Sequence, residues 1–307
     1  MYVPFGSFVD AVDMFDASLF GLASGEALAL DPQARMLLEQ TQEALVQAQL
    51  GQAAAGTGVY IGCMYTEYLD SILAPQGLAD SNSSAIIGHG LSFLGLAAGQ
   101  TEAAVAGGVN IMLEPRTTAR ICLLQALSPV GRCKTFDATG DGYGRGEGFA
   151  VAVLRGWQED GHPAEGSQIP AAIVKGSAVN QDGRSSSLTA PNGPSQQALV
   201  ASCLQEANLD AAAVALVAVH GTGTPLGDPI EVGALGGVLK ANGPGPHSLT
   251  LSSNKACYGH TEGTAGITGA LLALTSLQQH TCTPILNLRI LNPYVEAAFS
   301  DWASREG

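Results

Sequence analysis

Basic residues are scarce in this chain of 307 residues, which carries 13 Lys and Arg against 27 Asp and Glu and a formal charge of −14 at pH 7. Phosphate backbones and anionic headgroups repel such a chain, so electrostatic binding to nucleic acid or to a membrane surface is excluded as its main activity. Charged residues make up only 13% and hydrophobic residues 46%. That composition indicates a globular protein with a sizeable core rather than a disordered chain.

Paired cysteines and long apolar runs are also lacking. The six cysteines are scattered without a CxxC pair: Cys63, Cys122, Cys133, Cys203, Cys257 and Cys282. This argues against a disulfide framework or a metal site and favours a reducing compartment. The N-terminus does not have the basic start of a signal peptide, and the longest apolar stretch, 265–277, is too short to cross a bilayer. We therefore expect a soluble, cytoplasmic protein.

Short apolar segments alternate with helical patterns along the chain. The expected strands are Gly58–Gly62, Ala103–Val109, Phe149–Leu154, Ala171–Val179, Val214–Val219 and Leu249–Ser252. The expected helices run from the N-cap Asp31 to Leu50, from the N-cap Ser195 to Ala207, from Asp228-Pro229 onward, and from Glu262 to Leu277. This alternation predicts an α/β fold with largely parallel, buried sheets.

A histidine followed by glycines and hydroxyl side chains marks the first candidate site, within residues 219–231. His220 leaves the carboxyl end of an expected strand, which is where α/β sheets bind ligands. The hydroxyls of Thr222 and Thr224 can bind a polar ligand arm. A tight turn with a packed histidine is the alternative; it would be favoured for a lone histidine but not for the whole string.

A lysine and a histidine mark the second candidate site, within residues 252–263. A neutral imidazole at His260 can donate or accept a proton near pH 7, and Lys255 is predicted to pair with Glu262 and fix the geometry. A helix cap with a surface ion pair explains these residues equally well.

The glycine-dense segment 140–148, after 132–137, contains a loose dinucleotide fingerprint, but it precedes a strand instead of opening a helix, so it is interpreted as a structural loop.

These segments resemble, in order and over nearly the whole chain, the β-ketoacyl synthase family, specifically the ketosynthase domains of modular polyketide synthases and type I fatty-acid synthases. The matching segments are Phe15–Ala17 with Asp31–Gln33, Ala106–Asn110, Arg132–Asp137 with Gly142–Gly148, Gly176–Arg184 with Leu188–Ser195, and the His220 and Lys255/His260 segments. The resemblance implies a thiolase-like α/β fold. Two similar halves, 1–175 and 176–307, would each hold a five-stranded sheet, in five alternating layers of helices and sheets.

The resemblance also implies a reaction, a decarboxylative Claisen condensation. A cysteine thiolate takes an acyl chain, two histidines promote loss of CO2 from a malonyl group on acyl carrier protein, and the carbanion attacks the thioester. His220 and His260 match the family histidines, Lys255 matches the lysine that orders the site, and Glu262 supports it. Thr222 and Thr224 match the hydroxyls that hold the phosphopantetheine arm, which carries the substrate; no bound cofactor is implied. A homodimer is the family assembly.

The chain departs from the family pattern at the nucleophile. Between Phe93 and Leu94, about 28 residues that include the family elbow Asp-Thr-Ala-Cys-Ser-Ser-Ser have no counterpart. The family's N-terminal strand and C-terminal Gly-Phe-Gly-Gly-Thr-Asn segment are also not matched. In the family, the amide of the nucleophile and an amide of this C-terminal segment form the oxyanion hole, so the resemblance implies that both donors are missing. Losing even one such donor costs roughly 2.7–4 kcal/mol of transition-state stabilisation. We therefore expect a β-ketoacyl synthase-like protein that does not condense, is marginally stable and dimerises weakly.

Three functions are compatible with this pattern. The chain is a ketosynthase by descent that cannot condense, or it retains malonyl decarboxylation by the two histidines, or it is a non-catalytic scaffold. Cys257, three residues from His260, and Cys63, at the end of a strand, are candidate surrogate nucleophiles. Packing is the commoner role of such small thiols.

Overall fold

The described part of the chain contains two small sheets with one helix between them. The computed structural model describes residues 2–50, 56–68, 96, 100–156, 169–183, 190–239 and 249–303. In sequence order the elements named below are α1 (Ser24–Ala29), α2 (Pro32–Gln47), β1 (Thr57–Cys63), β2 (Ala103–Asn110), α5 (Pro115–Leu123), β3 (Gly148–Arg155), α6 (Gly193–Ala207), η2 (Ala211–Ala213), β4 (Leu216–Ala218), α7 (Gly227–Leu239), β5 (Thr250–Ser252), α8 (Lys255–Tyr258), η3 (Glu262–Thr264), α9 (Ala265–Gln279) and α10 (Pro293–Ala303).

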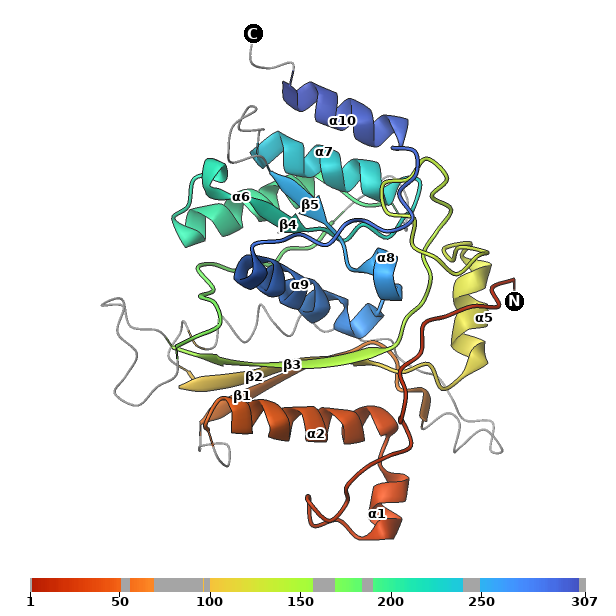
Figure 1. Cartoon of the computed structure of the whole chain (residues 1–307), viewed down its shortest axis with the longest axis vertical. Helices are drawn as coiled ribbons and strands as arrows, with labels where there is room; N and C mark the ends of the chain where they lie inside the picture. The colour runs from red at the N-terminus through yellow and green to blue at the C-terminus, as the bar shows by residue number, and fades with distance from the viewer. Residues whose placement is uncertain are drawn as a thin grey trace.

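The elements stack as helix, sheet, helix, sheet and helix (Figure 1). Helix α2 covers one face of the β1-β2-β3 sheet, and α9 lies between that sheet and the β4-β5 pair. Helices α6, α7 and α10 form the outer layer on the far side of β4 and β5. The expected order of layers is confirmed, and the chain has a thiolase-like α/β fold.

Strand β2 lies at the centre of the first sheet and is buried at every position. It runs parallel to β1, with Thr57 opposite Ala103, and antiparallel to β3, with Ala103 opposite Arg155. Its alanines and glycines let the neighbouring segments approach closely. A Cβ atom at Gly108 would lie 2.8 Å from the carbonyl oxygen of Gly263, so the second half of the chain packs directly on this strand.

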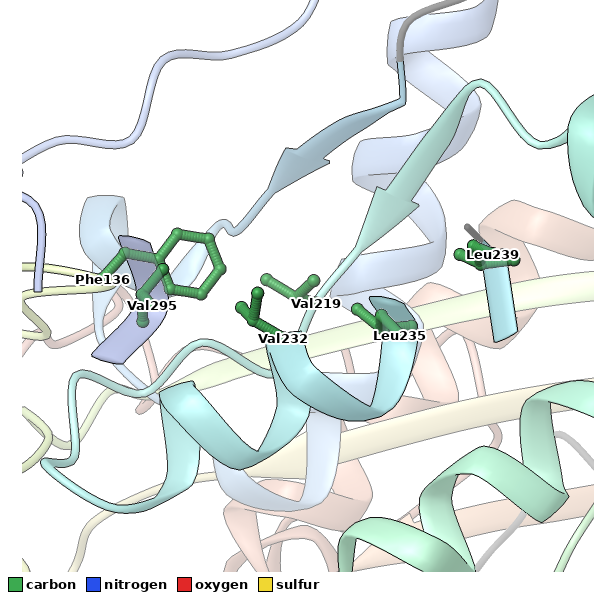
Figure 2. Close-up of a cluster of buried hydrophobic side chains, with 6 residues drawn as sticks. All are labelled: Phe136, Val219, Val232, Leu235, Leu239 and Val295. Carbon is green, nitrogen blue, oxygen red and sulfur yellow. The ribbon is translucent and has the colours of Figure 1, made fainter. Parts of the chain in front are cut away.

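A hydrophobic core cluster holds the outer layers together around β4. Its buried members are Phe136, Val219, Val232, Leu235, Leu239 and Val295 (Figure 2). Phe136 comes from the loop after α5, while the other side chains belong to the C-terminal half. The loop at 132–137 is thereby anchored to the strand end that carries His220.

Several expected elements are confirmed with small shifts in their ends, and two details are wrong. Asp31 caps α2, as expected, by accepting from the N–H of Gln33. The cap of α6 is Asn192 rather than Ser195, whose own N–H donates to the Asn192 side chain. The prediction of a strand over Ala171–Val179 is wrong: this segment forms no strand, and Gly176 lies against α6, where a Cβ would be 2.8 Å from the Ala207 nitrogen.

The sheets are smaller than expected within the described residues, with three strands in one and two in the other instead of five in each. The Phe93–Leu94 junction lies outside the described residues, so the expected consequences of the missing elbow stay predictions. Across the described ranges no helix combines the length and apolar character needed to span a membrane. Those ranges also contain no group of three His, Cys, Asp or Glu side chains placed to hold a metal ion.

Candidate active site

His220 and His260 lie side by side. His220 follows β4, where the N–H of Val219 still donates to Ser252 of β5, and His260 lies in the turn between α8 and η3. Their ring centroids are 5.0 Å apart with an interplanar angle of 88°. The two histidines therefore lie close together, although only His220 directly follows a strand; His260 is reached from β5 through the short helix α8.

The backbone of His220 is held by a carboxylate from α7. Glu231 accepts from the N–H of His220 at 2.6 Å and from the N–H of Gly221 at 2.9 Å. Asp228, in the same helix, accepts from the N–H groups of Phe136 at 2.8 Å and Gly223 at 3.1 Å. Neither carboxylate was recognised from the sequence as a support of the site, although both lie in the same glycine-rich segment as His220.

His260 is held by the glycine-dense loop. Its N–H donates to the Gly144 carbonyl at 2.7 Å, its carbonyl accepts from Gly146 at 2.9 Å, and its ring meets the edge of the Tyr143 ring at a centroid distance of 5.1 Å. Nδ1 of His260 accepts from the N–H of Glu262 at 3.2 Å. In the neutral imidazole this hydrogen-bond network places the proton on Nε2. The loop, which was interpreted as structural from the sequence, thus holds His260 in position.

The predicted Lys255–Glu262 ion pair is wrong. Glu262 instead binds Arg145, whose Nε and Nη2 donate to its two carboxylate oxygens at 2.9 and 2.8 Å. Gly259, at a φ of +79°, turns the chain between Lys255 and Glu262. Lys255 is 4% exposed, and the carboxylates that favour its charge are Glu231 and Asp228. Sequence spacing could not identify Arg145, which lies 117 residues away from its partner.

Both imidazoles are kept neutral. Burial among protein atoms, together with the Lys255 ammonium, lowers the pKa of His220 to about 4. Burial also lowers the pKa of His260 well below its usual range, with further contributions from His220, Lys255 and Arg145. His220 is also exposed to solvent, which weakens its electrostatic interactions. The lowered pKa nevertheless leaves the ring neutral near pH 7. Near pH 7 the pair offers N–H donors without a positive charge.

The two threonines begin the loop that leads from His220 into α7. Thr222 is 5% exposed, and its hydroxyl oxygen lies 3.5 Å from that of Thr224. The Thr224 hydroxyl accepts from the N–H of Gly227 at 3.2 Å, so it also caps the start of α7. Both hydroxyls thus lie in the loop that follows His220, and their binding of a ligand arm stays a prediction.

Comparisons with known families identify the chain. Residues 1–95 and 79–159 match the model described as "Beta-ketoacyl synthase, N-terminal domain", and residues 171–289 match "Beta-ketoacyl synthase, C-terminal domain". The chain belongs to the β-ketoacyl synthase family.

Relatives within the family are polyketide synthases. Mycoketide-CoA synthase of Mycobacterium tuberculosis is 37% identical over 99% of this chain and 8% of its own length. Polyketide synthase GfsE of Streptomyces halstedii is 35% identical over 95% of this chain and 8% of its own length. The chain therefore spans a small part of the length of these relatives.

Solved ketosynthase domains share the fold. An oxazolomycin ketosynthase domain of Streptomyces albus superposes with a TM-score of 0.84 at 28% identity, over 94% of this chain and 56% of that one. The ketosynthase from module 6 of the bacillaene synthase of Bacillus subtilis gives a TM-score of 0.83 at 29% identity, over 95% of this chain and 56% of that one. The chain spans just over half the length of these domains.

Four thiols of this β-ketoacyl synthase family member have pKa values shifted away from reactivity. Burial raises the pKa of Cys63, Cys203 and Cys257, and raises that of Cys133 to about 11. Cys133 is 1% exposed, and its sulfur donates to the Gly144 carbonyl at 3.7 Å. A reactive cysteine needs an electropositive setting that lowers its pKa. These shifts run the other way, including at the two candidate surrogates Cys257 and Cys63.

Removing the Lys255 charge should raise the pKa values of both histidines. In a Lys255→Met variant we expect the pKa of His220 to rise from about 4 toward the ordinary 6.5, and that of His260 to rise as well, because the ammonium opposes protonation of both rings. Titration of the ring signals by NMR measures this. Lys134→Met is the control, since that ammonium binds Asp141 at 2.7 Å and is no cause of either shift; equal pKa values in wild type and Lys255→Met would refute the assignment.

Proposed function

We propose that this β-ketoacyl synthase-like chain decarboxylates a malonyl group held as a thioester on acyl carrier protein and does not itself take up an acyl chain. The observation that carries the proposal is the pair of neutral imidazoles, 5.0 Å apart, in a chain where the pKa values of the Cys63, Cys133 and Cys257 thiols are raised. Decarboxylation needs hydrogen-bond donors at a developing enolate, whereas condensation also needs a thiolate. The N–H groups of the two imidazoles support the decarboxylation step, which needs only donors.

The proposed reaction balances without a cofactor. The bond between the malonyl carboxylate and its methylene carbon breaks, CO2 leaves, and the electron pair forms the enolate of the thioester. The Nε2–H of His260 and the imidazole N–H of His220 donate to the enolate oxygen, where fixed donors stabilise negative charge. A proton from water then adds to carbon and gives an acetyl thioester. Lys255 keeps both rings neutral, so they act as donors throughout.

The other parts of the proposal concern the substrate arm and the assembly. The paired hydroxyls of Thr222 and Thr224 support binding of the phosphopantetheine arm of acyl carrier protein, the substrate partner implied by polyketide synthase relatives. Residues 1–175 and 176–307 would form the two halves, and Glu262 supports the site through Arg145. A homodimer, weaker than in complete ketosynthases, and a cytoplasmic location complete the proposal.

The test is release of CO2 from malonyl-acyl carrier protein labelled in the carboxylate. We expect release by the wild-type chain at a rate above that of a His220→Ala variant, and no stoichiometric labelling of either chain by cerulenin, a thiol-directed ketosynthase inhibitor. Absence of release above the variant would leave the non-catalytic scaffold as the function. Stoichiometric cerulenin labelling at Cys257 or Cys63 would show that a surrogate nucleophile exists and would contradict the proposal.

A further inference from the structure

A buried ion pair joins Arg145 to Glu262, which lies two residues after His260 in the sequence. The side chains of Arg145 and Glu262 are 3% and 1% exposed, and two hydrogen bonds join them in a bidentate arrangement, Nε to Oε1 at 2.9 Å and Nη2 to Oε2 at 2.8 Å. The remaining Nη1 donates to the Thr118 hydroxyl at 2.7 Å, and the guanidinium lies 5.5 Å from the centre of the Tyr65 ring. Its planar fork is thus fixed on several sides.

The pair joins two segments that also meet through their backbones. Arg145 and His260 form an isolated parallel bridge, and the N–H of Gly146 donates to the His260 carbonyl at 2.9 Å. The position of Glu262 relative to His260 is therefore set from two directions: by the chain itself and by a side chain of the opposite half.

Glu262 has an unusual backbone conformation. Its φ is 45°, in the left-handed region that costs a residue with a Cβ atom about 1–2 kcal/mol. Such a conformation persists only where the surroundings hold it. In this conformation the N–H of Glu262 reaches Nδ1 of His260 at 3.2 Å, which is the contact that leaves the imidazole proton on Nε2.

We propose that the Arg145–Glu262 pair is a positioning unit for His260. By holding Glu262 in its left-handed conformation, the pair keeps the Glu262 N–H on Nδ1 and the Nε2–H directed toward the substrate. The inference rests on the proposed function, because Nε2–H is the donor used there. Neither residue of the pair contacts substrate; both act through His260.

A merely structural tie between the halves is the competing explanation, and a paired substitution separates the two. Removing one partner leaves an unpaired buried charge, whereas replacing both by apolar side chains of similar size is often neutral for stability. Arg145→Met combined with Glu262→Met therefore removes the pair without that penalty. The matched control is Glu147→Gln on the same loop, because Glu147 accepts from Val9 at 2.9 Å and Met112 at 2.8 Å and does not contact His260.

The experiment measures the tautomer of His260 in the full chain. With isotope-labelled histidine, NMR of the ring nitrogens distinguishes a protonated from an unprotonated Nδ1, and a His260→Gln variant identifies the signal among the six histidines. We expect an unprotonated Nδ1 in wild type and in Glu147→Gln. In the double variant we expect a mixture of both tautomers and about fivefold faster hydrogen exchange at the amide of residue 262, the effect of one lost hydrogen bond.

A folded double variant that keeps the wild-type tautomer and the wild-type exchange at residue 262 would overturn the proposal. Should the double variant fail to fold, Glu262→Gln replaces it, since the amide keeps the shape of the side chain but accepts only one of the two guanidinium bonds. The same direction of change, at a smaller size, is then expected, and no change would again overturn it. The measurement does not involve turnover, so a failed CO2-release assay would reject the proposed function and leave this result standing.

Discussion

Replacing His260 by alanine should lower the rate of CO2 release from malonyl-acyl carrier protein by about 10²–10³-fold, the usual effect of losing one donor at a developing oxyanion. The Nε2–H of His260 is fixed before the reaction, because Nδ1 is engaged by the Glu262 N–H at 3.2 Å. Alanine removes this donor and also the edge contact to His220. Initial rates at a saturating concentration of malonyl-acyl carrier protein measure the effect.

The control for this variant is His280→Asn. His280 is an exposed residue in the left-handed cap of α9, with a φ of 52°, a conformation that asparagine tolerates. Its rate and its melting temperature should equal those of the wild type. A His260→Ala chain that retained its rate within about threefold, far short of a lost oxyanion donor, would show that the histidine pair does not carry the reaction.

Asp137→Ala should be the most destabilising single substitution considered, lowering the free energy of unfolding by roughly 3–5 kcal/mol. Asp137 is 3% exposed. Its carboxylate accepts from the N–H and hydroxyl of Thr139 at 2.8 and 2.6 Å, and from the N–H groups of Arg289 and Ile290 at 2.6 and 3.0 Å. Alanine leaves three backbone donors without their acceptor, in the contact that closes the C-terminal segment onto the loop after α5.

Urea unfolding measures the loss, and Asp141→Ala is the matched control. Asp141 binds Lys134 at 2.7 Å with its side chain 37% exposed, and an exposed pair of this kind contributes at most about 1 kcal/mol. Equal losses in the two variants would contradict the argument from burial and hydrogen bonding.

The stability supplied by Asp137 should also depend on pH. Burial alone would raise the pKa of this carboxyl, but the hydrogen bonds from Thr139, Ile290 and Arg289 outweigh burial and lower it below its usual value. A carboxyl with a lowered pKa in the folded state stabilises the protein fully above its unfolded pKa, about 3.9. The difference between wild type and Asp137→Ala should therefore be constant near neutrality and shrink as the pH falls below about 4.

Local features were predictable from the sequence. The Asp31 cap of α2, the small apolar strand β2 and the placement of His220 at a strand end follow from capping chemistry and from the apolar pattern of each segment. The segments of His220 and His260 follow the parallel strands β4 and β5, whose carboxyl ends share an edge of the sheet, but the course of the chain through α8 to His260 was not predictable.

Contacts between distant segments were not predictable. Lys255 and Glu262 have complementary charges and lie close in the sequence, yet Glu262 binds Arg145 because the turn at Gly259 directs it toward the loop before β3. Ala171–Val179 has the apolar composition of a strand, but a strand also requires a hydrogen-bonding partner, and composition does not reveal whether one is present. Both wrong predictions, the ion pair and the strand, depended on contacts that only the tertiary fold determines.

Intact-mass spectrometry of the chain and malonyl-acyl carrier protein, incubated together with an acyl thioester present, distinguishes decarboxylation from condensation. We expect the carrier protein to lose the mass of CO2 while this chain keeps its own mass, because the histidine pair acts and no cysteine is acylated. A chain that gains the mass of the acyl group, with a carrier-bound product longer than acetyl, would contradict it.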